Sequence, residues 1–79
     1  MTVTAYILLN VEMSAQPAVL EALKKMEPIR EVHIIFGAFD IIVKAEFEDN
    51  VHLGSFIVDE LKSLEGVLEA QTNVCAADL

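Results

Sequence analysis

The sequence predicts an α+β sandwich in which two helices cover one face of a four-stranded antiparallel sheet. Four segments are rich in β-branched and other apolar residues, and two more have apolar residues at helical spacing. Their order along the chain is βαββαβ, in two halves of nearly equal length, which is typical of the ferredoxin-like arrangement. The 79 residues contain no linker, low-complexity tract or internal repeat, so residues 1–79 are expected to form one domain.

The first half begins with an alternating strand at residues 2–11. Its two faces consist of Val3, Ala5, Ile7 and Leu9, and of Thr4, Tyr6, Leu8 and Asn10. A helix should follow, because Ser14 can cap a helix and Pro17 is tolerated in a first turn, and Pro28 should end it. The apolar stripe of this helix consists of Val19, Ala22, Leu23 and Met26. A second strand is expected at residues 29–36.

The second half repeats this succession. A third strand is expected at residues 40–48, and Asp49 or Asn50 can cap the helix that follows. The apolar stripe of this helix consists of Leu53, Phe56, Ile57, Leu61 and Leu64. Gly66 lies where a glycine often ends a helix, and residues 67–75 predict a fourth strand with a weaker pattern.

Charge and composition exclude several classes of function. The net charge is −8, from 13 acidic and 5 basic residues, and no basic cluster exists beyond the pair at 24–25, so direct binding of DNA or RNA is disfavoured. No apolar run is long enough to cross a membrane, and no signal peptide is visible. A single cysteine, Cys75, excludes an internal disulfide and a Cys-x-x-Cys metal site. A cytoplasmic location is therefore expected.

One face of the predicted sheet is too apolar to be left in water. Hydrophobic residues make up 54% of the chain, although a domain of this size buries only about 60–65% of the surface that its unfolded chain exposes. The face away from the helices would carry Tyr6, Leu8, Ile35 and Ile42, beside Thr4, Lys44 and His33. Burial of such a face, at ~25 cal/mol per Å², stabilises by several kcal/mol. We therefore expect two subunits to pack sheet against sheet.

The turn between the second and third strands is the best candidate for a binding site. Gly37, Ala38, Phe39 and Asp40 combine a glycine with a carboxylate between two apolar segments. Glycine can adopt a positive φ and expose backbone N–H groups, and the Asp40 carboxylate can accept hydrogen bonds from a cationic or amine-bearing ligand. An ordinary hairpin turn is the alternative interpretation.

No catalytic site is predicted. His33 lies on a strand and His52 in the second helix, and nothing in the sequence brings them together. Cys75 has no histidine nearby in the sequence, and buried thiols usually behave as small hydrophobic groups. The acidic clusters are Glu46, Glu48 and Asp49, and Glu65 and Glu69. They are interpreted as solvated surface, because calcium sites need a denser, patterned loop. We expect no enzyme activity, no metal site and no cofactor.

Three motifs occur in an order that points to a family. They are the apolar strand at residues 5–9, the Gly-x-aromatic-Asp turn at residues 37–40 with the apolar strand after it, and Glu65-Gly66-Val67 followed by Thr72. In this order on a βαββαβ frame, they make essentially the whole chain resemble the effector-binding (RAM) domain of Lrp/AsnC-type transcriptional regulators.

The resemblance implies a sensor of amino acids or related small ligands. Subunits of this family dimerise through their sheets as a dimeric α/β barrel, and dimers assemble into rings, commonly octamers, with amino acids bound between dimers. By this analogy the ligand-binding residues would be Phe36, Gly37, Ala38, Phe39, Asp40 and Thr72. Phe39 stands where the family often has tyrosine, so a hydroxyl contact would be absent here.

The regulators of this family also carry an N-terminal helix-turn-helix domain, for which this chain has no room. We therefore expect a stand-alone member, which senses an effector or modulates a full-length Lrp/AsnC regulator by forming mixed oligomers. Two other interpretations stay open. A small dimeric α+β barrel enzyme would need a pocket lined by His33 or Tyr6, and a structural oligomerisation subunit would assemble without a ligand. An ACT-type domain usually has a glycine-rich ligand turn after its first strand. It is disfavoured here, because residues 11–14 contain no glycine.

Overall fold

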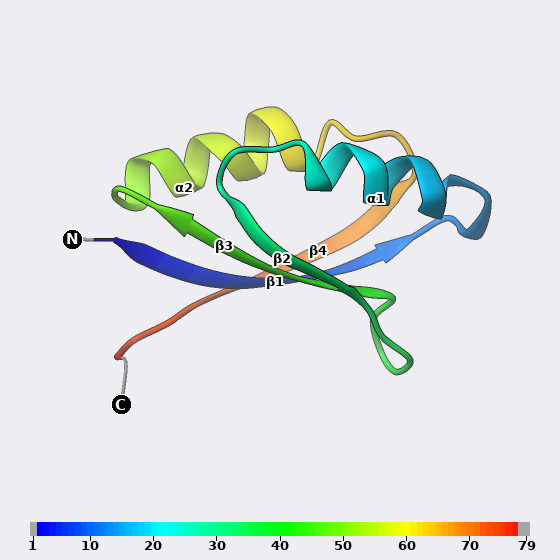
Figure 1. Cartoon of the computed structure of the whole chain (residues 1–79), viewed down its shortest axis with the longest axis horizontal. Coiled ribbons are helices and arrows are strands. Elements are labelled where there is room, and N and C mark those ends of the chain that lie inside the picture. Colours follow the sequence, from blue (N-terminus) through cyan, green and yellow to red (C-terminus); the bar gives the residue numbers. More distant parts are fainter. Residues whose placement is uncertain (1, 78–79) are drawn as a thin grey trace.

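A computed structural model describes residues 2–77 and confirms the α+β fold (Figure 1). The strands are β1 (Val3–Val11), β2 (Ile29–Ile34), β3 (Ile41–Phe47) and β4 (Val67–Val74), which form one antiparallel sheet in the order β2-β3-β1-β4. The helices are α1 (Gln16–Lys24) and α2 (Asn50–Phe56), and both cover the same face of the sheet. A short 3-10 helix, η1 (Met13–Ala15), precedes α1, and a π-helical turn, η2 (Ile57–Leu61), continues α2. This is the predicted ferredoxin-like order.

The core lies between the sheet and the two helices. Side chains along β1 and β3 alternate between buried and partly exposed, as their sequences predict. The buried core consists of Ala5, Ile7, Leu9, Val11, Val19, Leu23, Ile41, Val43, Ala45, Phe47, Leu53, Phe56 and Leu61. The predicted faces of the first strand are therefore confirmed, as is the burial of Val19 and Leu23 in α1 and of Leu53, Phe56 and Leu61 in α2 and η2. Met26 and Leu64, which we expected in the helices, lie beyond their ends, where they are partly buried against the core.

The two helices begin differently. Asp49 caps α2, because its Oδ1 accepts a hydrogen bond of 2.9 Å from the backbone N–H of His52. The predicted cap of α1 is wrong: Ser14 lies inside η1, and Ala15 occupies the N-cap position without a side-chain hydrogen bond. The cause is a hydrogen bond of 3.0 Å from the Ala15 N–H to the Glu12 carbonyl, which turns the chain before the serine can act as a cap.

Gly66 holds the start of β4 against the loop that follows β1. Its backbone lies in the left-handed region, with a φ of 95°, and a Cβ at this position would overlap the Cβ of Ala15. Its carbonyl accepts a hydrogen bond of 2.8 Å from the Glu12 N–H. Both the backbone conformation and the close approach therefore require glycine at this position.

The opposite face of the sheet carries neither helix (Figure 1). The strand register places Leu8 opposite Ile42, and Ile42 opposite His33 on its other side. Tyr6 lies opposite Lys44 and is 40% exposed. Residues opposite one another in a sheet have side chains on the same side. We call this surface the uncovered face. It contains Thr4, Tyr6, Leu8, His33, Ile42 and Lys44, together with the charged and polar residues Glu31, Glu46, Glu69, Gln71 and Asn73.

Two further features bear on the classes of function considered above. None of the helices within residues 2–77 is long and apolar enough to cross a membrane. In the same part of the chain, no group of three or more His, Cys, Asp or Glu side chains is placed to hold a metal ion. The single cysteine, Cys75, is half-buried just beyond β4, where its N–H donates to the Thr4 carbonyl at 2.9 Å.

Candidate functional site

The predicted binding turn is a hairpin connection that extends away from the helices at one end of the sheet (Figure 1). Because β2 ends at Ile34 and β3 begins at Ile41, residues 35–40 form this connection, which is longer than the predicted turn. A hydrogen bond of 2.9 Å from the Ile35 N–H to the Asp40 carbonyl closes its base. Ile35, which we expected on the uncovered face, therefore lies beyond β2 in the hairpin and is half-buried.

Asp40 fixes the hairpin to the end of β1. Its backbone N–H donates to the Leu9 carbonyl at 2.9 Å, and its side-chain Oδ2 accepts a hydrogen bond of 3.0 Å from the Val11 N–H. Pairing between β1 and β3 ends at Leu9 and Ile41, so the carboxylate acts as an acceptor for β1 beyond the last strand pair. One oxygen of Asp40 is thus used within the chain, whereas Oδ1 accepts no hydrogen bond from residues 2–77.

The tip of the hairpin is open to solvent. Phe36, Gly37 and Ala38 are all exposed, and the exposed fraction of Phe36 is 102%. A Cβ added to Gly37 would have no heavy atom within 4 Å. The expected positive φ does not occur at Gly37, and Gly66 is the one residue among 2–77 that has it. Neither the backbone conformation nor packing within this chain accounts for a glycine at position 37.

The remaining predicted residues lie nearer the body of the domain. Phe39 is half-buried beside Asp40. Thr72 lies in β4 opposite Ile7, on the side of the sheet that the helices cover, and is also half-buried. Because β1 lies between β3 and β4, a single chain does not bring Thr72 to the hairpin tip. A site that contains both would need a second subunit.

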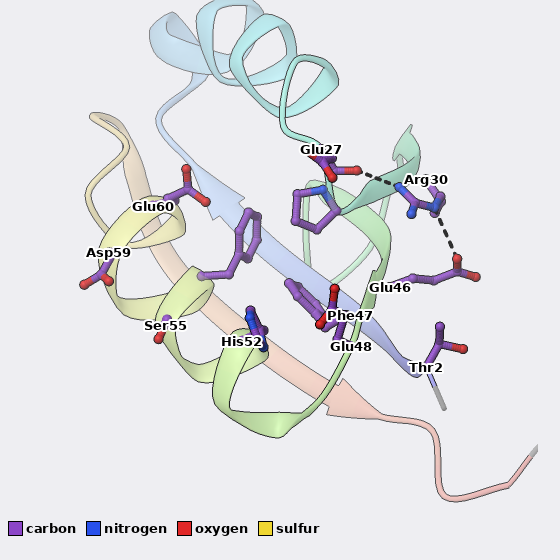
Figure 2. A pocket seen from close by; sticks show the side chains of 12 residues that line it. Thr2, Glu27, Arg30, Glu46, Phe47, Glu48, His52, Ser55, Asp59 and Glu60 are labelled. Atoms are coloured by element: carbon purple, nitrogen blue, oxygen red, sulfur yellow. Dashed lines mark hydrogen bonds and ion pairs between the residues drawn. The ribbon is translucent and has the colours of Figure 1, made fainter.

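A cleft at the other end of β3 is a feature that sequence reasoning misses. It has a volume of about 630 Å³ and lies between α2 and the segment that links α1 to β2 (Figure 2). It is lined by Thr2, Glu27, Pro28, Arg30, Glu46, Phe47, Glu48, His52, Ser55, Phe56, Asp59 and Glu60. These residues come from widely separated parts of the chain, so no spacing in the sequence reveals them.

His52, on the wall of this cleft, contacts the cap of α2 and forms an ion pair with it when its ring is protonated. Its Nδ1 lies 2.6 Å from Oδ1 of Asp49. The hydrogen bond to the carboxylate raises the pKa of His52 above its ordinary value. In the opposite direction, the hydrogen bond from the His52 backbone N–H, and then that from its ring, lower the pKa of Asp49. Both side chains are exposed, so solvent screens the pair.

The sequence matches the model of the Lrp/AsnC ligand binding domain over residues 4–78. The chain belongs to this family. The hairpin with its Gly-x-aromatic-Asp sequence, the strand order and the glycine at position 66 thus occur together in a domain of the predicted family.

The curated relatives are HTH-type transcriptional regulators by name. An uncharacterised HTH-type transcriptional regulator of Pyrococcus abyssi is 31% identical over 74 residues, which cover 90% of this chain and 49% of the relative. This Lrp/AsnC domain therefore spans about half the length of the curated relatives that it matches.

Solved structures show the same fold. The crystal structure of FFRP-DM1 has a TM-score of 0.89 at 27% identity, covering 92% of this chain and 97% of that chain. The transcriptional regulator NMB0573 of Neisseria meningitidis, solved as a complex with L-methionine, has a TM-score of 0.92 at 22% identity. That match covers 98% of this chain and 51% of the Neisseria chain.

Proposed function

We propose that this domain is an amino-acid sensor of the Lrp/AsnC type, which binds its ligand at the β2–β3 hairpin, between subunits. One observation carries the proposal: Asp40 fixes the base of the hairpin, while the tip at Phe36 and Gly37 is fully open to an incoming molecule. The Neisseria regulator supports the class of ligand, because its structure holds L-methionine in a chain that includes the same fold. A fixed base with an exposed tip limits the cost of ordering the loop on binding.

The hairpin offers groups for both ends of an amino acid. Exposed backbone N–H groups at Gly37 and Ala38 can donate to the ligand carboxylate, and Oδ1 of Asp40 can accept from its ammonium group. The missing side chain at position 37 lets the ligand approach the backbone closely. Phe36 and Phe39 add apolar surface, and Thr72 of a neighbouring subunit completes the site.

The uncovered face supports the assembly that such a site requires. Tyr6 is 40% exposed, and Leu8 and Ile42 are only half-buried, so a second sheet packed here removes apolar surface from water. Two copies of this face form a dimer, and dimers assemble further into a ring, an octamer by analogy with the family. A related subunit presents a similar face, so the same contact allows mixed oligomers with a full-length regulator.

A thermal-shift screen against the twenty amino acids at millimolar concentration tests the ligand. A ligand present at about 100 times its Kd stabilises the folded state by about 2.7 kcal/mol. For a domain of this size that raises the midpoint by roughly 10–20 °C. We expect one amino acid, or a few related ones, to produce this rise. A folded, oligomeric protein that responds to none of them would instead be a structural subunit.

A matched pair of glycine variants tests the location of the site. Neither Gly37 nor Gly54 has a heavy atom within 4 Å of an added Cβ, so Gly37→Ala and Gly54→Ala should both fold. We expect Gly37→Ala to lower the affinity for the amino-acid ligand at least about tenfold, or about 1.4 kcal/mol, because the added methyl group blocks the ligand's approach to the backbone. Gly54→Ala, in α2, should leave the affinity unchanged. Equal affinities in both variants would remove the hairpin from the site.

A matched pair of glutamate variants tests the dimer. Ile42→Glu places a charge on the uncovered face, whereas Val58→Glu places one on the outer surface of η2, where Val58 is 66% exposed. We expect sedimentation at micromolar concentration to show a smaller species for Ile42→Glu and an unchanged one for Val58→Glu, because an unpaired charge opposes burial of the face. A folded Ile42→Glu protein with the wild-type mass would contradict the sheet-to-sheet contact.

A further inference from the structure

The cleft at the far end of β3 has the size and shape of a site for a small molecule. Its volume of about 630 Å³ lies within the range of roughly 300–1,000 Å³ that is usual for ligand sites. Figure 2 shows its walls: α2 and η2 carry His52, Asp59 and Glu60 on one side, while Glu27 and Arg30 lie on the other. The hairpin lies at the opposite end of β3, so this cleft is separate from the proposed amino-acid site.

The floor of the cleft is apolar. Phe47 of β3 and Phe56 of α2 meet there, with ring centroids 5.3 Å apart and planes inclined by 54°. The exposed fractions are only 5% for Phe47 and 4% for Phe56, so core packing holds both rings in place. Pro28 lines the cleft beside them. A ligand would therefore meet a rigid apolar floor of small area, because core packing leaves little of either ring accessible.

The cations of the rim already have partners. Arg30 Nε lies 3.2 Å from Oε1 of Glu46, and its Nη1 donates to the Glu27 carbonyl at 2.6 Å, as the dashed lines in Figure 2 show. His52 is paired with Asp49. The positively charged side chains of the rim thus already contact acceptors of the protein itself rather than pointing freely into the cleft.

The carboxylates of the rim are in excess. The acidic residues that line the cleft are Glu27, Glu46, Glu48, Asp59 and Glu60. Of these, Glu46 alone forms an ion pair with another residue of the described chain, 2–77. Negative charge around a concave, partly apolar surface concentrates the field and attracts cations. The cleft is complementary to a molecule that is positive at one end and apolar at the other.

We propose that this cleft binds a small organic cation, namely a primary amine or guanidine joined to an apolar body. The apolar body would lie on the floor near Phe47, Phe56 and Pro28. The charged group would lie among the rim carboxylates, with Asp59 and Glu60 on the α2 side. An α-amino acid fits less well, because the rim repels its carboxylate. The two proposed sites, at opposite ends of β3, would thus bind different classes of ligand: an amino acid at the hairpin and an organic cation in the cleft.

Three probes of the same shape test the charge requirement: phenethylamine, the neutral 2-phenylethanol and the anionic 3-phenylpropionate. Titration of the wild-type protein, followed by NMR shifts of residues that line the cleft, should give the tightest binding with phenethylamine, by about tenfold over the alcohol. The anion should not bind. Equal affinities for the amine and the alcohol, or no binding of the amine at millimolar concentration, would overturn the proposal.

Two double variants that remove the same charge test the location. Asp59→Asn with Glu60→Gln changes the rim, and Glu21→Gln with Glu65→Gln changes exposed carboxylates elsewhere. We expect about a tenfold loss of phenethylamine binding in the first and less than about twofold in the second. Equal losses would mean that only the net charge matters. If the first variant fails to fold, the wild-type titrations with the three probes still test the proposal, because the residues whose NMR signals shift show where each probe binds. Loss of binding in Gly37→Ala instead would place the amine at the hairpin and refute the separate site.

Discussion

Replacement of Asp40 by alanine should destabilise the domain even when no ligand is bound. The change removes the acceptor for the Val11 N–H, a hydrogen bond of 3.0 Å, and Val11 is only 7% exposed. A buried N–H that loses its partner costs about 1–3 kcal/mol, and a bond to a charged acceptor contributes about 1.5–3 kcal/mol. We therefore expect the free energy of unfolding to fall by about 2 kcal/mol, which lowers the thermal midpoint by roughly 8–16 °C.

Asp40→Asn is the matched control for this prediction. Asparagine keeps an oxygen that can accept from Val11 but loses the negative charge, so its stability should lie between those of the wild type and Asp40→Ala. Urea unfolding of all three proteins at one protein concentration measures the differences in stability, because the proposed association of subunits would also contribute to it. A wild-type stability for Asp40→Ala, within about 0.5 kcal/mol, would refute the anchoring role. Because Asp40→Ala is expected to lower stability, its ligand affinity should be compared with that of the wild type only under conditions in which both proteins are folded.

Two further predictions concern the helix layer. Gly66→Ala should destabilise by at least about 1 kcal/mol, because φ is 95° and the new methyl group meets Ala15. Gly54→Ala should instead stabilise by about 0.5–1 kcal/mol, because Gly54 occupies an exposed position of α2. Thermal unfolding with Gly66→Ala the more stable of the two would contradict this packing. Since Asp49 raises the pKa of His52 in the folded state, the stability from this pair is fully present below the unfolded pKa of about 6.5 and is lost as pH rises through the raised value. His52→Gln should therefore destabilise more at about pH 5.5 than at about pH 8 in urea unfolding, and the reverse order would exclude the pair.

The sequence predicts the fold and the buried faces well because those depend on local periodicity. The position of a side chain on a strand or helix follows from its immediate neighbours in sequence. The anchoring bond between Asp40 and Val11 joins residues 29 apart, so its existence depends on the sheet register. For the same reason the cleft escapes prediction. Local rules also fail where a residue type is compatible with more than one conformation. Ser14 could cap a helix but lies in a 3-10 turn, and the positive φ expected at Gly37 occurs at Gly66 instead.

The placement of charge bears on whether a strongly acidic chain can form the proposed sheet-to-sheet dimer. The net charge of −8 would oppose the pairing of two copies if the carboxylates lay on the contact surface. On the uncovered face, however, the Glu31 carboxylate lies 3.9 Å from the Lys44 ammonium, and Glu46, opposite Thr4, forms an ion pair with Arg30. Glu69, opposite Asn10 at one end of this face, forms no ion pair within residues 2–77, whereas Glu27, Glu48, Asp59 and Glu60 lie around the cleft. Repulsion between two such sheets would therefore be weaker than the net charge suggests, and burial of the apolar side chains of Tyr6 and Ile42 would favour the proposed contact.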